Sequence, residues 1–231
     1  MLETMGVDHV VSVDLHSAQI EVFFKPQFRY AIQIMTGDTL FNCFLLNSQQ
    51  VDNLEAFPQI LGEPIVVAPH SAAVNRAAKF RDNLSRTIDE FVPLAFVIRK
   101  HQLDKHQPGE LVGDINGKDC IVVDTLVGTG ATLVKTATVL KANGAKTVSA
   151  FAVHARYSAD YMVLIPLFQA LQTLENCKEL DKLVTTNTIP MHFKANEQSS
   201  KIVTLSVAPF IAEVISCIHT KISIIQVSKT K

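Results

Sequence analysis

The chain alternates short runs of apolar and β-branched residues with segments that repeat apolar residues at helical spacing. The short runs predict strands at 9–15, 63–70, 91–100, 119–124, 147–155 and 182–188. The helical spacing predicts helices at 72–84, 131–144 and 206–220. Strands that alternate with helices are typical of an α/β domain with a mainly parallel sheet, and the sequence therefore predicts that fold class.

Residues 121–132, IVVDTLVGTGAT, lead from a predicted strand through a turn of small residues into a predicted helix. Backbone N–H groups at a helix start lack internal partners and attract anions. Gly128 and Gly130 would let the backbone approach a phosphate closely. The stretch lacks the lysine of a Walker A loop and does not match GxGxxG. The pattern alone leaves open whether this is a phosphate-binding turn or a tight turn without a ligand.

Composition narrows the classes of function. Of 231 residues, 48% are hydrophobic and 19% are charged, which is ordinary for a globular protein. The net charge of −1 gives no general attraction to nucleic acid or to an anionic membrane. No apolar run reaches the ~18 residues of a membrane span, and the start lacks the basic segment of a secretory signal. Four cysteines without paired spacing predict reduced thiols and a cytoplasmic location.

Two stretches break the alternation of strands and helices. Residues 25–50 follow no clear period, and residues 161–173 are apolar and interrupted by Pro166. Both are predicted to be insertions, and residues 27–50 are expected to be exposed because they interrupt a strand end.

The turn VVDTLVGTGATLVK resembles the phosphoribosyl-binding loop of the phosphoribosyltransferase-like fold. Other stretches resemble ribose-phosphate pyrophosphokinases in the same order, at 5–24, 66–80, 110–124, 144–158, 183–190 and 201–220. The resemblance implies a three-layer phosphoribosyltransferase-like fold. It also implies the family's activity, in which the diphosphate of ATP is transferred to ribose 5-phosphate with Mg²⁺ to make phosphoribosyl pyrophosphate for nucleotide biosynthesis.

The resemblance also divides the chain into segments. Residues 1–24 are expected to be a remnant of a first phosphoribosyltransferase-like domain, and 25–50 an insertion. Residues 51–220 are expected to form the C-terminal phosphoribosyltransferase-like domain, with the second insertion near 161–173, and 221–231 a tail.

Roles for single residues follow from the resemblance. The ribose 5-phosphate loop maps onto Asp124, Thr125, Gly128, Thr129, Gly130, Ala131 and Thr132. The implied metal ligands are Asp14, His16 and Asp52, and Arg76 is implied to lie near the nucleotide. The implied catalytic basic pair is Arg99 and Lys100, although two solvated charges at a strand end explain those residues equally well.

Three positions depart from the family pattern. Thr125 and Gly128 stand where acids are expected in the loop, and His70 stands where an acid follows the second predicted strand. One lost charge-assisted hydrogen bond costs ~1.5–3 kcal/mol, so two could silence an enzyme. The hypotheses are therefore an impaired pyrophosphokinase, or a non-catalytic relative that acts as a regulatory or assembly subunit. Such a subunit would form a homo-oligomer, or a hetero-oligomer with full-length family members. A phosphoribosyltransferase acting on a base is a weaker third reading.

Overall fold

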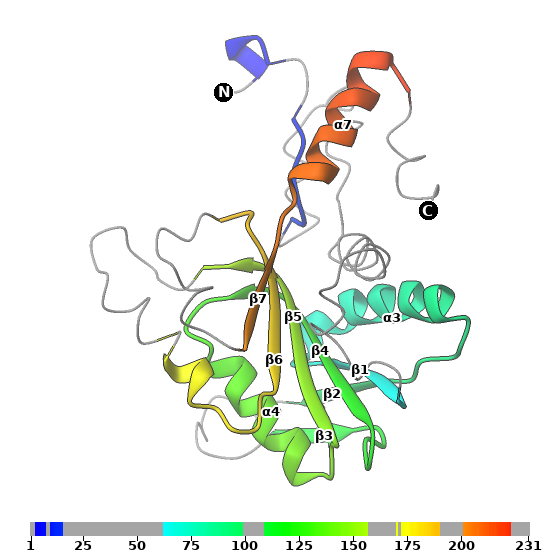
Figure 1. The fold of residues 1–231 in the computed structure, drawn as a ribbon, viewed down its shortest axis with the longest axis vertical. Helices are drawn as coiled ribbons and strands as arrows, with labels where there is room; N and C mark the ends of the chain where they lie inside the picture. Colours follow the sequence, from blue (N-terminus) through cyan, green and yellow to red (C-terminus); the bar gives the residue numbers. More distant parts are fainter. Residues whose placement is uncertain are drawn as a thin grey trace.

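The computed structural model describes residues 3–7, 10–15, 62–98, 109–156, 170, 172–189 and 201–222 (Figure 1). The predicted insertion at 25–50 lies outside the described residues, as does most of the stretch at 161–173. The segment boundaries implied by the resemblance therefore stay predictions.

A seven-stranded sheet lies at the centre of the domain, in the order β3-β2-β1-β4-β5-β6-β7 (Figure 1). Its strands are β1 (Pro64–Ala68), β2 (Leu94–Ile98), β3 (Glu110–Val112), β4 (Asp119–Val127), β5 (Thr147–Ala155), β6 (Lys182–Thr186) and β7 (Ile202–Leu205). Neighbouring strands run parallel, apart from the antiparallel pair of β2 and β3 at one edge. The mainly parallel sheet predicted from the sequence is confirmed.

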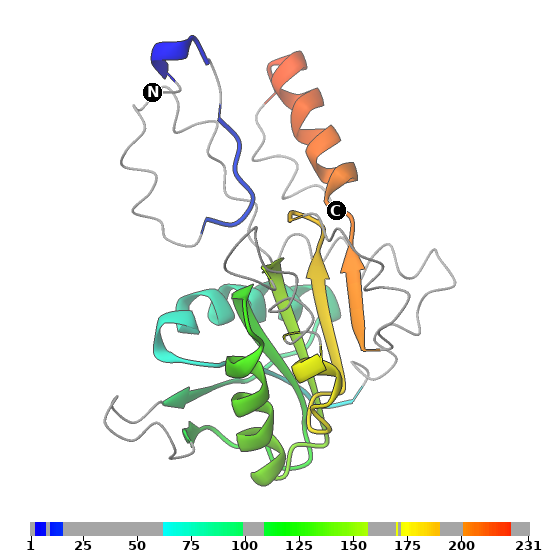
Figure 2. The same ribbon diagram turned by 90° about the vertical axis from the view of Figure 1, so that its left-hand side faces the viewer.

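Helices cover both faces of the sheet (Figures 1 and 2). The described helical elements are η1 (Glu3–Met5), η4 (Ser71–Ala73), α3 (Val74–Ile88), α4 (Ala131–Ala142) and α7 (Ala208–Thr220). Helix α4 buries Leu133 and Leu140 against one face of the sheet. Helix α3 buries Phe80 against the other face, where its ring lies 5.7 Å from that of Phe151. The fold therefore has the three layers expected.

Several element boundaries match the prediction closely. Strand β5 spans the predicted 147–155, and α4 ends at Ala142 just before Gly144. Gly144 has a φ of 87°, the left-handed conformation expected at a helix C-terminus.

Three predictions of local structure were wrong or incomplete. The strand predicted at 9–15 does not form in the described residues 10–15, where Val13 makes an isolated bridge. Asp14 explains this, because its φ of 49° interrupts an extended backbone. The sequence pattern also missed the two edge strands β3 and β7, which are short and half-exposed.

Candidate functional site at the carboxyl edge of the sheet

Polar residues collect where the parallel strands β1, β4, β5 and β6 end. His70 follows β1, the turn at 128–130 follows β4, Arg156 follows β5, and Thr188 follows β6. The carboxyl ends of parallel strands share one edge of the sheet, which is where α/β proteins bind ligands. We call this the carboxyl edge.

The strand that leads into the predicted phosphate turn is longer than the sequence indicated. Strand β4 continues to Val127, which pairs with Ala155 of β5. Asp124 therefore lies within the strand, and its predicted place at the strand end was wrong. Ladder pairing with β5 explains the difference, because it extends the strand beyond the apolar run that predicted it. Thr132 does lie in the first turn of α4, as predicted.

The turn at 128–130 depends on a glycine at position 130. Gly130 is the N-cap of α4 with a φ of 76°, and no side chain caps the helix there. A Cβ at this position would lie 2.8 Å from Cγ of Leu174, so the close approach also requires glycine. The N–H of Ala131 donates to Oγ1 of Thr129 at 3.4 Å, which places this hydroxyl at the helix start.

Leu174 is a site residue that sequence reasoning missed. It follows the stretch predicted to be an insertion, yet it is fully buried in the core together with Ala170. Ala170, which lies within that stretch, is thus packed into the domain, while Gln172 and Thr173 are exposed. The apolar character of Leu174 could have indicated its burial. Its contact with Gly130 is tertiary, and no local sequence pattern indicates it.

Asp124 is the carboxylate nearest in sequence to the turn. Its Oδ1 accepts a hydrogen bond of 2.7 Å from the N–H of Thr125. Its Oδ2 lies 3.8 Å from Nε2 of His70, which is beyond hydrogen-bonding distance. Asp124 and His70, placed by adjacent strands β4 and β1, therefore face each other without a direct bond.

The two positions that lack the expected acids differ in their surroundings. The side chain of Thr125 is buried, so a carboxylate there would leave water. Among the described residues, a Cβ at Gly128 would meet only the backbone oxygen of Arg156, at 3.9 Å, which leaves room for an acid at this position.

Asp14 and Arg76, two of the predicted site residues, form a buried ion pair. Nη1 of Arg76 donates to Oδ1 of Asp14, and Nη2 donates to the carbonyl of Leu15 at 3.4 Å. Asp14 is only 1% exposed. The pair joins the N-terminal segment to the start of α3.

His154 of β5 contacts the same segment from the sheet. Its Nε2 lies 3.0 Å from the carbonyl oxygen of Asp14, and its Nδ1 lies 2.8 Å from Oγ1 of Thr188. A carbonyl only accepts, so Nε2 carries the proton, and in the neutral ring Nδ1 accepts from the Thr188 hydroxyl. His154 thus joins residues 10–15 to the carboxyl edge.

Arg76 engages one oxygen of Asp14 in this structure, and the magnesium role implied by the resemblance stays a prediction. Mg²⁺ takes oxygen ligands in octahedral geometry, and here a guanidinium engages the carboxylate. In the part of the chain that the structure describes, no group of three or more His, Cys, Asp or Glu side chains could hold a metal. His16, Asp52, Arg99 and Lys100 lie outside the described residues, so their roles stay predictions.

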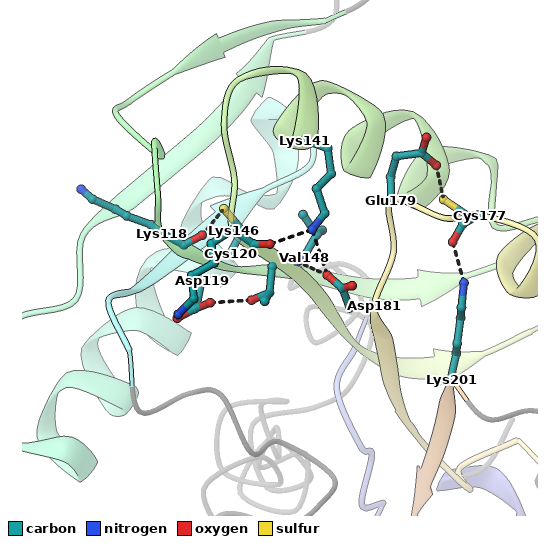
Figure 3. Close-up of polar contacts among 11 residues, drawn as sticks. Lys118, Asp119, Cys120, Lys141, Lys146, Val148, Cys177, Glu179, Asp181 and Lys201 are labelled. Atoms are coloured by element: carbon teal, nitrogen blue, oxygen red, sulfur yellow. Dashed lines mark hydrogen bonds and ion pairs between the residues drawn. The ribbon is translucent and has the colours of Figure 1, made fainter.

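The opposite edge of the sheet is held by internal polar contacts (Figure 3). Asp119 accepts a 2.7 Å hydrogen bond from the hydroxyl of Thr147, and Nζ of Lys146 lies 3.3 Å from its other oxygen. Asp181 accepts from the N–H of Val148 at 2.7 Å. These contacts join the first residues of β4 and β5 and the residue before β6. We call this the amino edge.

Lysines extend these contacts to neighbouring elements. Nζ of Lys141 lies 3.2 Å from Oδ2 of Asp181, which connects the end of α4 to β6. Nζ of Lys201 donates to the carbonyls of Glu175 and Cys177 at 2.9 and 2.6 Å, and Figure 3 shows the Cys177 contact. Lys201 thereby holds the helical residues 172–175, which carry Leu174.

The comparison with protein families decides which family this fold and this loop represent. Residues 82–229 match the family model described as the phosphoribosyl synthetase-associated domain. The chain belongs to this family. The phosphoribosyl synthetase-associated domain covers α4, the turn at 128–130 and α7, so the match includes the predicted phosphate loop itself.

Individual relatives agree with the family. The ribose-phosphate pyrophosphokinase of Wolinella succinogenes is 32% identical over 222 residues, which are 95% of this chain and 60% of the relative. That of Vibrio cholerae is 31% identical over 96% of this chain and 62% of its own length. The chain thus spans about three fifths of these curated relatives.

A solved structure also matches. The crystal structure of phosphoribosylpyrophosphate synthetase from Mycobacterium smegmatis superimposes with a TM-score of 0.73 at 29% identity, covering 95% of this chain and 61% of the other. The match supports the phosphoribosyltransferase-like fold. None of the described helices has the length and apolar character needed to cross a bilayer.

Proposed function

We propose that the turn at 128–132 holds the phosphate of ribose 5-phosphate, in a domain related to the ribose-phosphate pyrophosphokinases that use ATP. The single observation that carries the proposal is the start of α4. There Gly130 is left-handed, lies against Leu174 and leaves the helix without a side-chain cap. N–H groups at a helix start favour an anion, and the family match covers this loop.

Other residues of the carboxyl edge would orient the sugar and the nucleotide. The N–H of Thr125 donates to Oδ1 of Asp124, which fixes the carboxylate. Its Oδ2 would accept a hydrogen bond from a ribose hydroxyl. Arg76 would contribute positive charge near the nucleotide, although Asp14 neutralises much of it. Magnesium and the basic pair Arg99 and Lys100 belong to the proposal through the family resemblance.

Diphosphate transfer by this chain is expected to be weak. Transfer depends on positioning and on neutralising charge, and Thr125 and Gly128 provide no carboxylate for either task. The deciding assay supplies ATP, ribose 5-phosphate and Mg²⁺ and measures AMP release. Calorimetry with ribose 5-phosphate, run in parallel, should show binding in the millimolar range, about −4 kcal/mol. Absence of any binding would overturn the proposed function, while rapid AMP release would overturn the expected impairment.

A non-catalytic assembly subunit is the second candidate, and the surface of α7 favours it. Ile211 and Ile215 are exposed four residues apart on this helix, which places them on one side. Such a surface fits a partner subunit of the same family, in a homo-oligomer or hetero-oligomer. Sedimentation of the parent chain and of Ile215→Lys tests this candidate, because a monomeric parent chain would exclude self-association. A cytoplasmic location fits either candidate, because the sequence predicts reduced thiols.

A further inference from the structure

Each of two carboxylates, Asp14 and Asp124, faces a side chain that carries nitrogen. Arg76 engages Oδ1 of Asp14. Nε2 of His70 lies 3.8 Å from Oδ2 of Asp124. His70 is partly exposed, and Asp124 is mostly covered.

This arrangement is poorly suited to a magnesium ion beside Asp124. Mg²⁺ prefers oxygen ligands at about 2.0–2.1 Å in octahedral geometry, and the side chain of His70 offers a nitrogen instead. Thr125 and Gly128 carry no charge. A metal at this position would therefore have one carboxylate on the protein and an imidazole close to it.

The same arrangement suits a sugar hydroxyl. At 3.8 Å, Nε2 of His70 and Oδ2 of Asp124 are too far apart to bond each other, yet one oxygen atom lying beside both can be within hydrogen-bonding distance of each. A hydroxyl is both donor and acceptor, so it can donate to Oδ2 of Asp124 and accept from the Nε2–H of His70. These two contacts fix a hydroxyl from two sides without a metal.

We infer that His70 takes the place of a magnesium ion in holding the sugar, so that this site binds a sugar phosphate independently of magnesium. The inference rests on the proposed phosphate turn at 128–132. His70 would then decide whether sugar binding requires magnesium. An imidazole at position 70 gives binding without the metal, and an oxygen ligand at position 70 gives binding that depends on it.

The test is calorimetry of the whole chain with ribose 5-phosphate, first in EDTA and then in millimolar Mg²⁺. The expected result is a dissociation constant that differs less than twofold between the two conditions. Binding that appears only with Mg²⁺, or that tightens tenfold with it, overturns the inference and leaves the proposed function standing. No binding in either condition overturns both.

Variants at position 70 sharpen the test. His70→Asp removes the donor and adds a second carboxylate beside Asp124. Binding in EDTA should weaken by about two- to tenfold, as expected for the loss of a neutral hydrogen bond, and Mg²⁺ should restore much of it. His219→Asp, at the exposed end of α7, is the matched control and should behave as the parent chain.

If thermal melting shows that His70→Asp does not fold, a second variant still tests the inference. His70→Gln keeps an N–H donor and adds no carboxylate. It should bind within about fivefold of the parent chain and stay insensitive to Mg²⁺. A His70→Asp variant that folds and binds equally well in EDTA would overturn the inference, as would a His70→Gln variant that requires Mg²⁺.

Discussion

The ring of His154 donates a hydrogen bond to the backbone carbonyl of Asp14, across 140 residues of sequence, with 3.0 Å between Nε2 and the oxygen. This contact fastens a short N-terminal segment to a strand of the central sheet. The segment has no regular hydrogen-bonding ladder of its own, since Val13 makes an isolated bridge. Its position therefore depends on side chains.

Replacing His154 with alanine should release residues 10–15 from the sheet. The carbonyl of Asp14 would lose its donor, at a cost of about 1–3 kcal/mol if it stays buried. Hydrogen exchange measured by mass spectrometry should show faster exchange in residues 10–15 and unchanged protection in β4. His154→Gln keeps a donor at a similar reach and should restore part of the protection. Equal exchange in the parent chain and His154→Ala would show that the contact with Arg76 holds the segment alone.

The contact between Gly130 and Leu174 predicts a rescue between two variants. Gly130→Ala should be destabilising, because the left-handed conformation costs an L-residue about 1–2 kcal/mol and the new Cβ meets Leu174. Leu174→Ala alone should cost about 2–5 kcal/mol by leaving a cavity. In the double variant the clash is gone, so the loss should be smaller than the sum of the two.

Urea denaturation of the four proteins gives this coupling energy, and calorimetry with ribose 5-phosphate gives the effect on the turn. Additive losses would mean that Leu174 does not constrain position 130. Gly117→Ala, at a φ of 72° where a Cβ would meet no described atom within 4 Å, controls for the cost of the conformation itself.

An acid at position 128 should introduce magnesium dependence without harm to the fold. Gly128→Asp places a carboxylate where the nearest atom to its Cβ is a backbone oxygen at 3.9 Å. The variant should melt within a few degrees of the parent chain and should bind ribose 5-phosphate more tightly with Mg²⁺ than in EDTA. Thr125→Asp should instead destabilise the protein by about 1–3 kcal/mol, because its carboxylate would be buried. The opposite order of stabilities would contradict the structure.

The buried thiol of Cys120 predicts a loss of stability at high pH. Burial, assisted by the nearby charge of Asp119, raises the pKa of Cys120 from 9.0 to about 12. Above pH 9 the unfolded chain loses this proton while the folded chain keeps it, so the free energy of unfolding should fall as the pH rises from about 9 to 12. Below pH 9 the thiol should contribute no slope.

Denaturation at pH 8 and pH 10 measures this effect. Cys120→Ala should show a smaller drop between the two values than the parent chain does. The raised pKa also predicts that Cys120 reacts slowly with thiol reagents at pH 8 in the folded protein. Rapid modification of Cys120, identified by peptide mapping, would contradict its burial.

The sequence predicted those elements whose residues carry their own signal. The apolar run at 147–155 and the glycine after α4 each mark an element by local chemistry, and both predictions were confirmed. Strand β7 was missed because three of its four residues are only partly buried and it pairs on one side. Its weak apolar pattern says little without the neighbouring strand.

The candidate site was predictable in part. The small residues at 128–132 identify a turn that leads into a helix, and the resemblance gave it a ligand. The pairing of Asp14 with Arg76 joins residues 62 apart in sequence, and no spacing rule indicates that a predicted metal ligand would meet a guanidinium instead. The facing of His70 and Asp124 likewise depends on β1 lying beside β4.

The amino edge and the carboxyl edge of the sheet differ in whether their polar groups serve folding or binding. At the amino edge, Asp119 and Asp181 bind partners within the chain itself, so this edge contributes to the free energy of folding. At the carboxyl edge, a side chain at position 128 would touch little of the described structure, so a change there should alter what is bound more than it alters the fold. Side chains on the carboxyl edge can therefore change in charge while the contacts of the amino edge keep the domain folded.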